Sequence, residues 1–109
     1  MKNSSSYLHH IMDETNYLLE VSAGVDLDTF QADETLKRAV VRSLEIIGEA
    51  VKNLPDEFKE AHPQVEWRKM AATRNRLIHG YFSVDFEIVW DVVINKIPHL
   101  HEEIEKLLS

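Results

Sequence analysis

The chain has 109 residues, which is enough for one domain with a single hydrophobic core but hardly for two. Hydrophobic residues make up 44% of it and only 3 Gly and 3 Pro interrupt them, which excludes a disordered or fibrous protein. The absence of Cys excludes disulfides, thiolate catalysis and a sulfur-rich zinc site. We therefore predict a single globular domain that spans residues 1–109.

The net charge of −7 argues against a protein that coats nucleic acid in general, because such proteins are normally basic. The charge is uneven, however, since residues 67–83 hold four basic residues and no acidic one: Arg68, Lys69, Arg74 and Arg76. A local patch of this kind allows an acidic protein to bind a phosphate-bearing partner. A solvated helix face that happens to lack acidic residues would give the same pattern.

The N-terminal residues are polar and precede no apolar segment of the kind found in signal peptides. The apolar runs are only a few residues long, far short of a membrane span. We therefore expect a cytoplasmic protein with no membrane partner.

The first half of the chain predicts two long helices from apolar residues at three- and four-residue spacing. The first covers roughly residues 5–23 and ends at Gly24. Residues 26–32 form a connector with room for one helical turn. The second helix begins after Asp33, which is a good N-cap, and stops at Pro55.

The second half predicts a short helix over residues 56–61 and a third long helix over residues 65–79. A fourth begins after Ser83 or Asp85. Pro98 lies inside the apolar pattern of that last helix and removes one helical hydrogen bond, so we expect a kink or break there.

No segment alternates convincingly with period two, so the predicted fold is all-α: an antiparallel bundle of four to five helices. Gly48 lies inside the second long helix, where a glycine costs about 1 kcal/mol relative to alanine. Gly48 therefore indicates close helix packing or room for a partner, unless it is incidental.

The segment that best suits chemistry is residues 74–81. Arg74 offers a permanent planar cation for phosphate oxygens, and His79 titrates near neutral pH and can move a proton. Asn75 lies four residues before His79, on the same helix face, where it can orient the imidazole. Arg74 and His79 are about 140° apart around an ideal helix. They converge only if the helix ends at His79, as Gly80 allows, or if a second chain completes the site.

A purely structural interpretation of the same residues is also available. Arg74 can pair with Glu45 or Glu49 of the second helix. His79 can be a helix C-terminal residue favoured by the helix dipole, and Tyr81 a core aromatic whose hydroxyl is hydrogen-bonded.

A resemblance adds to these observations. The run Arg74-Asn75-Arg76-Leu77-Ile78-His79-Gly80-Tyr81-Phe82 resembles the signature of the HEPN superfamily. It is most similar to the HepT branch, whose motif is Arg, four residues, His, one residue and Tyr. Residues 42–50 and 84–90 also resemble that branch, so the three matching segments are spaced over most of the chain.

The resemblance implies a bundle of HEPN type and a ribonuclease that acts as a homodimer without metal or cofactor. His79 would be the general base or acid at the RNA 2′-hydroxyl, Arg74 would hold the scissile phosphate, and Asn75 would orient the pair. The products would be a 2′,3′-cyclic phosphate and a free 5′-hydroxyl, from cellular RNA with transfer RNA as the leading candidate. Further candidates for RNA binding are Arg68, Lys69 and Arg76.

The resemblance also implies a partner, an MntA-like nucleotidyltransferase that acts as the antitoxin. It would transfer AMP to Tyr81, which follows a helix-ending glycine. The added charge and bulk beside Arg74 and His79 would then repel or exclude an RNA phosphate.

Two other functions stay open. The first is a non-catalytic substrate- or nucleotide-binding subunit of a minimal nucleotidyltransferase, in which His79 need not move a proton. The second is a helical interaction protein, which predicts that Arg74 is buried against Glu45 or Glu49 and that no cleft is open.

The remaining His and Trp residues do not favour other sites. Neither His9 with His10 nor His99 with His101 has the four-residue spacing of a two-ligand metal site on a helix. Trp67 and Trp90 are predicted to be core or dimer-interface residues rather than platforms for bases.

Overall fold

The structure is a computed structural model that describes residues 4–79 and 84–109, apart from the side chains of Ile78 and His79. No described residue lies in a strand, so the all-α prediction is confirmed. The elements in chain order are α1 (Ser4–Ser22), α2 (Leu27–Ala32), α3 (Glu34–Asn53), α4 (Asp56–Ala61), α5 (Trp67–His79), α6 (Phe86–Asp91), the π-helix η1 (Val92–Lys96) and α7 (Ile97–Leu108).

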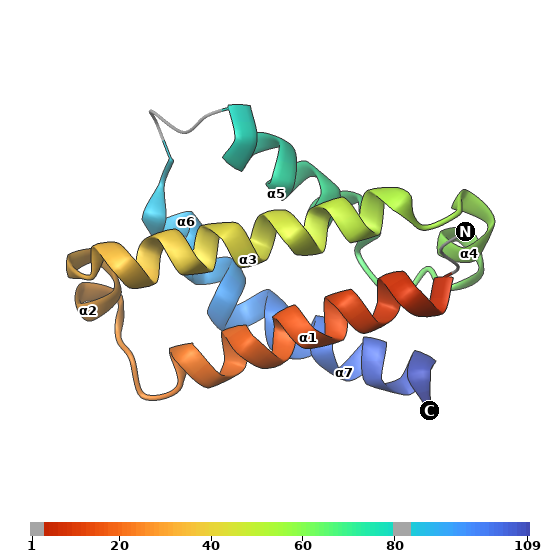
Figure 1. The fold of residues 1–109 in the computed structure, drawn as a ribbon, viewed down its shortest axis with the longest axis horizontal. Coiled ribbons are helices and arrows are strands. Elements are labelled where there is room, and N and C mark those ends of the chain that lie inside the picture. Colours follow the sequence, from red (N-terminus) through yellow and green to blue (C-terminus); the bar gives the residue numbers. More distant parts are fainter. Residues whose placement is uncertain (1–3, 80–83) are drawn as a thin grey trace.

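The long helices run antiparallel to their neighbours (Figure 1). The chain runs out along α1 and returns along α3, and α7 packs against α1 on another side. Helix α5 packs on α3, and the segment from α6 to α7 passes behind α1 and α3 in this view. Helix α3 therefore lies between α1 and α5 and connects the core to the segment that holds residues 74–79.

Aspartates begin several of these helices. The carboxylate of Asp33 accepts a hydrogen bond from the backbone N–H of Leu36 at 3.0 Å, which confirms the predicted N-cap of α3. Asp26 caps α2 in the same way, and Asp85 caps α6. At the other end of α1, Gly24 has a φ of +73°, the left-handed conformation that commonly ends a helix.

The break expected near Pro98 is confirmed, and it takes the form of a π-helix. In η1 the backbone N–H of Ile97 donates to the carbonyl of Val92, five residues earlier. Helix α7 follows directly, with Pro98 in its first turn. The widened turn thus lets the last helical segment change register without leaving the bundle.

Aromatic and aliphatic side chains fill the core. Trp90 stacks on the fully buried Phe30 with ring centroids 4.5 Å apart, and the indole N–H of Trp67 donates to the carbonyl of His62 at 2.9 Å. Both tryptophans are buried, as predicted. The largest fully buried aliphatic side chains come from α1, α3 and α7: Ile11, Leu18, Leu44, Ile47, Ile97 and Ile104.

Two boundaries differ from the prediction. Helix α5 begins at Trp67, two residues later than expected, because the N–H of Trp67 donates to the carbonyl of Val65 in a tight turn. The side chain of Val65 is buried, which explains why it extended the apolar pattern. Residues 27–32, expected to be mostly connector, form the whole of α2.

Among the described helices, none combines the length and the apolar character that a membrane span needs.

Candidate functional site

Helices α3 and α5 approach each other closely where Gly48 faces Arg74. A Cβ atom built on Gly48 would lie 2.1 Å from the Cβ of Arg74 and 3.1 Å from the carbonyl oxygen of Met70. No side chain fits this space without moving one of the helices. Of the two explanations for Gly48, close helix packing is therefore the one that the structure supports.

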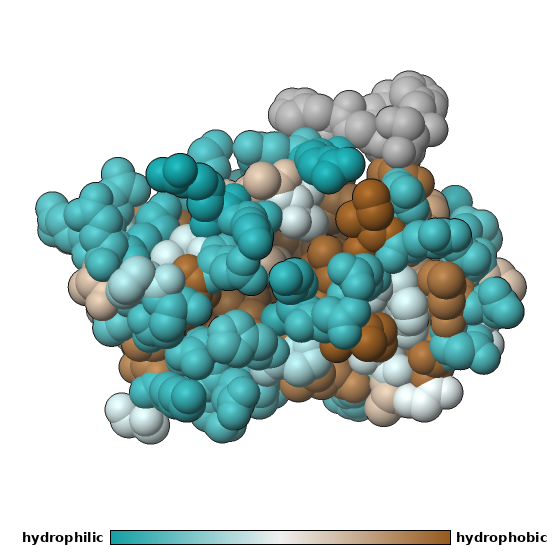
Figure 2. Space-filling model, turned by 180° about the vertical axis from the view of Figure 1, so that it is seen from behind, coloured by the Kyte–Doolittle hydropathy of each residue, from teal (hydrophilic) through white to brown (hydrophobic). Residues whose placement is uncertain are grey.

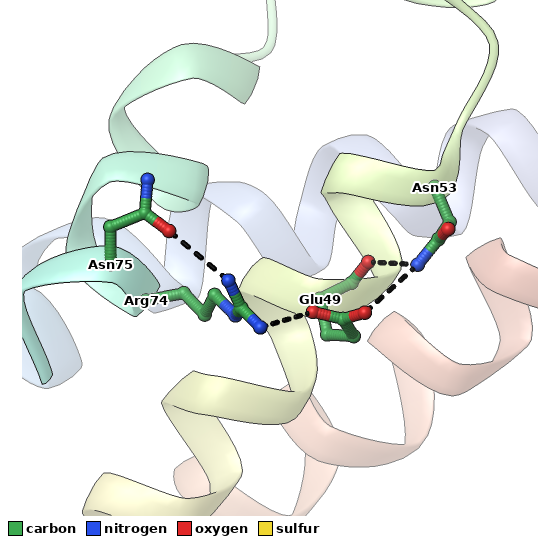
Figure 3. A network of polar contacts seen from close by, with 4 residues as sticks. All are labelled: Glu49, Asn53, Arg74 and Asn75. Carbon is green, nitrogen blue, oxygen red and sulfur yellow. Dashed lines mark hydrogen bonds and ion pairs between the residues drawn. The ribbon is translucent and has the colours of Figure 1, made fainter. Parts of the chain in front are cut away.

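The guanidinium of Arg74 is held from two sides (Figure 3). Its Nη2 lies 2.8 Å from a carboxylate oxygen of Glu49, and its Nη1 donates to Oδ1 of Asn75 at 3.1 Å. The amide of Asn53 in turn donates to the backbone and side-chain oxygens of Glu49, at 2.8 and 3.3 Å. Because only 20% of the Arg74 side chain is exposed, its position is well defined.

One donor of Arg74 has no acceptor in this arrangement. The Nε atom is buried and makes no hydrogen bond within the described part of the chain. A buried donor without an acceptor costs about 1–3 kcal/mol. Because Nε is buried, a phosphate can reach Arg74 only through the exposed part of the guanidinium, where it competes with Glu49.

An open groove of about 480 Å³ borders Arg74. Its polar lining comes from α1, α3 and α5, and we call it the Arg74 groove: Tyr7, His10, Arg42, Glu45, Glu49, Asn53 and Arg74. Two arginines face two glutamates, so its formal charge is balanced if His10 is neutral. No local pattern indicated Tyr7 or His10, because they reach the groove only through the packing of α1 on α3, whereas Arg42 belongs to the segment 42–50 that resembles the HepT branch.

This geometry tests the interaction-protein interpretation. Arg74 does pair with Glu49, as that interpretation predicted. Its second expectation, that no cleft is open, is wrong, because the Arg74 groove lies beside the pair.

Residues 11–107 match the family described as Ribonuclease HepT-like. The chain belongs to the HepT-like ribonuclease family. The predicted membership of the HEPN superfamily is thereby confirmed, and the helical bundle is of the HEPN type.

Relatives support the same assignment over nearly the whole chain. A provisionally named RNase from Caldanaerobacter subterraneus subsp. tengcongensis is 46% identical over 109 residues, which cover 100% of this chain and 97% of that protein. A probable ribonuclease HepT from Thermococcus cleftensis is 43% identical over 108 residues, 98% of each chain. A provisionally named RNase from Methanocaldococcus jannaschii is 43% identical over 108 residues, 99% of this chain and 89% of that protein. No solved structure matches the chain significantly.

The structure describes only part of the HepT-like motif. Arg74 and Asn75 are in contact, so Asn75 orients Arg74 in this single chain. The backbone of α5 is helical through His79, which places His79 about 140° from Arg74 around the helix axis. The His79 side chain, Gly80 and Tyr81 lie outside the described residues, so their expected roles stay predictions.

The candidate RNA-binding residues of the HepT-like domain are exposed on α5. Lys69 lies 2.5 Å from Glu66, and Lys96 lies 3.7 Å from the same carboxylate. The hydrogen bond and charge of Lys69, followed by the charge of Lys96, lower the pKa of Glu66. Arg76 is on the same flank as Lys69, whereas Arg68 lines a hollow shared with α4.

Within the described residues, no group of three or more His, Asp or Glu side chains is arranged to hold a metal ion.

Proposed function

We propose that this HepT-like ribonuclease is the toxin of a toxin–antitoxin pair and cuts cellular RNA as a homodimer without a metal ion. The family assigns ribonuclease activity in general. The observation that carries the proposal is the placement of the motif arginine: Arg74 is fixed by Glu49 and Asn75 at the edge of an open groove. Transfer RNA is the leading substrate.

The proposed reaction is an internal transfer of the phosphoryl group. His79 takes the proton of the RNA 2′-hydroxyl, and the 2′-oxygen attacks the neighbouring phosphorus. The bond from phosphorus to the 5′-oxygen breaks, and that oxygen takes up a proton and leaves as a 5′-hydroxyl. Arg74 stabilises the charge that develops on the phosphate, which becomes a 2′,3′-cyclic phosphate.

A homodimer would bring the two functional groups together. Arg74 and His79 of one chain diverge by about 140° because α5 is helical through both. We therefore propose that Arg74 of one subunit and His79 of the other act on the same phosphate. A two-fold dimer would contain two such sites.

Control by AMP transfer belongs to the same proposal. A cognate MntA-like nucleotidyltransferase would modify Tyr81 and so block access of RNA to Arg74 and His79. The Tyr81→Phe variant should cut RNA like the wild type yet escape the antitoxin. Undiminished silencing of this variant by the antitoxin would contradict this part of the proposal.

The direct test is cleavage of total cellular RNA by the purified protein in EDTA, with mapping of the RNA ends. The wild type and a His9→Ala control should cut and leave cyclic phosphates, whereas His79→Ala should not cut. Purified transfer RNA should be cut in the same way. Absence of cleavage by wild-type protein whose mass shows an unmodified Tyr81 would instead favour the binding-subunit function, with which the net charge of −7 agrees.

A further inference from the structure

A second groove lies on the other flank of α5, between this helix and the segment formed by η1 and α7. Its volume is about 280 Å³ and its floor is apolar, with Val65, Met70 and Leu100 among the lining residues. These residues give the floor a nonpolar surface that a flat ring can cover. Figure 2, seen from behind the view of Figure 1, shows that apolar residues are exposed among hydrophilic ones on the back of the molecule.

The mouth of this groove is basic. Lys69, Arg76, Lys96 and His99 line it, together with the single carboxylate of Glu66. We call this site the basic groove. Three permanent cations against one carboxylate give a local excess of positive charge on a protein whose net charge is −7. Local positive charge on an acidic body attracts an anion to that place and away from the rest of the surface.

Glu66 forms ion pairs with Lys69 and Lys96, and both pairs stay exposed to solvent. It lies 2.5 Å from Lys69 and 3.7 Å from Lys96, and all three side chains are more than 40% exposed. Exposed ion pairs of this kind contribute little free energy, so a phosphate can displace the carboxylate. The lysines are thus held near the groove yet stay available to a ligand.

The basic groove also extends toward the motif. Arg76 and His79 are three residues apart on α5, so their positions are neighbours on the helix surface. Arg74 and Arg76, in contrast, are about 160° apart around the axis. A strand that leaves the basic groove past Arg76 therefore reaches the position of His79 directly.

We propose that the basic groove binds a nucleotide that flanks the cleaved bond in a single-stranded segment of RNA. The base lies on the apolar floor with His99 beside it, and the adjoining phosphates contact Lys69, Arg76 and Lys96. The volume lies just below the usual range for ligand pockets, which fits one base rather than a folded RNA. The inference rests on the proposed ribonuclease function for the identity of the polymer, and it adds Lys96 and His99, which no motif indicates.

The test measures the affinity of a short fluorescent single-stranded RNA by anisotropy, at several salt concentrations, in the His79→Ala background. Lys96→Gln should weaken binding about fivefold and lower the salt dependence by about 0.7 in log–log slope, the value for one lost phosphate contact on a single strand. Glu66→Gln should tighten binding, because it removes the carboxylate that competes with the phosphate. Lys106→Gln is the matched control, since Lys106 is also exposed, also pairs with one glutamate and lies on α7 outside the groove.

The outcomes separate this inference from the proposed function. Opposite effects of Lys96→Gln and Glu66→Gln, with Lys106→Gln unchanged, would support the basic groove even if the wild type cut no RNA. If neither groove variant differed from Lys106→Gln while the wild type cut RNA in EDTA, the basic groove would be wrong and the ribonuclease function would stand.

Discussion

The two flanks of α5 carry arginines two residues apart in very different surroundings. Arg74 is four-fifths buried, lies against Gly48 and is paired with Glu49 in a groove of balanced charge. Arg76 is exposed on a groove whose mouth carries an excess of cations. Helix α5 thus carries the fixed guanidinium of Arg74 on one flank and the exposed cations of the basic groove, which supply mainly charge, on the other.

This difference predicts a division of labour. Stabilising a transition state needs donors held in one geometry, whereas attracting an RNA strand needs charge that tolerates several geometries. Changes around Arg74 should therefore lower kcat, and changes in the basic groove should raise KM.

Arg74→Lys should lower kcat for RNA cleavage by about 100- to 1000-fold, with little change in RNA affinity. Lysine keeps the charge but loses the planar fork that binds Glu49, Asn75 and the phosphate together. Arg38→Lys is the matched control, an exposed arginine of α3 outside both grooves. A kcat equal to that of the wild type would mean that Arg74 supplies charge alone.

Gly48→Ala should lower the free energy of unfolding by about 2 kcal/mol and reduce cleavage, because its Cβ would displace Arg74. Urea denaturation and kcat measured on the same preparation test both effects. Gly24→Ala is the comparison: nothing lies within 4 Å of its Cβ, and its positive φ alone should cost about 1 kcal/mol without loss of cleavage. Equal kcat values for the two variants would contradict the role given to the contact between α3 and α5.

Arg76→Gln should raise KM for RNA about fivefold and leave kcat within about twofold of the wild type. Steady-state cleavage at several RNA concentrations separates the two constants. Its effect should therefore be the reverse of that of Arg74→Lys, although the two arginines are two residues apart. A lower kcat at unchanged KM would place Arg76 in the chemistry instead.

Glu66→Gln should produce a small pH-dependent change in Tm. The Lys69 and Lys96 ammonium groups lower the pKa of Glu66, so the stabilisation is present above the pKa of an unfolded glutamate and is lost as the pH falls through the lower folded pKa. The variant should melt slightly below the wild type at neutral pH and converge with it at acidic pH. Glu105→Gln removes an exposed charge of α7 and should show no such convergence.

Much of this arrangement follows from local sequence signals. The apolar spacing, Asp33 and Pro55 defined α3, and Glu49 was one of the two partners predicted for Arg74. The break at Pro98 was also predictable, because a proline inside a helix must lose a hydrogen bond. Its form as a π-helix was not, since that depends on which upstream carbonyl the packed bundle leaves for Ile97.

Neither of the two grooves could be predicted from the sequence, because each depends on packing between helices that are far apart in the chain. Tyr7 and His10 reach Arg74 across the contact between α1 and α3, and Lys96 and His99 reach α5 only after η1 shifts the register of the last helix. These pairings join residues far apart in the chain and leave no local pattern. The sequence therefore predicted Lys69 and Arg76 as binding residues but not the groove they belong to.

The most direct test of the central claim, that Arg74 and His79 of different subunits form one site, is complementation between two inactive variants. Arg74→Lys and His79→Ala proteins would be unfolded together, refolded as a mixture and assayed for RNA cleavage in EDTA. We expect recovery of about a quarter of wild-type activity, because half of the dimers would be mixed and each would hold one intact site. A mixture as inactive as either variant alone, beside an active wild type, would contradict a site shared between subunits.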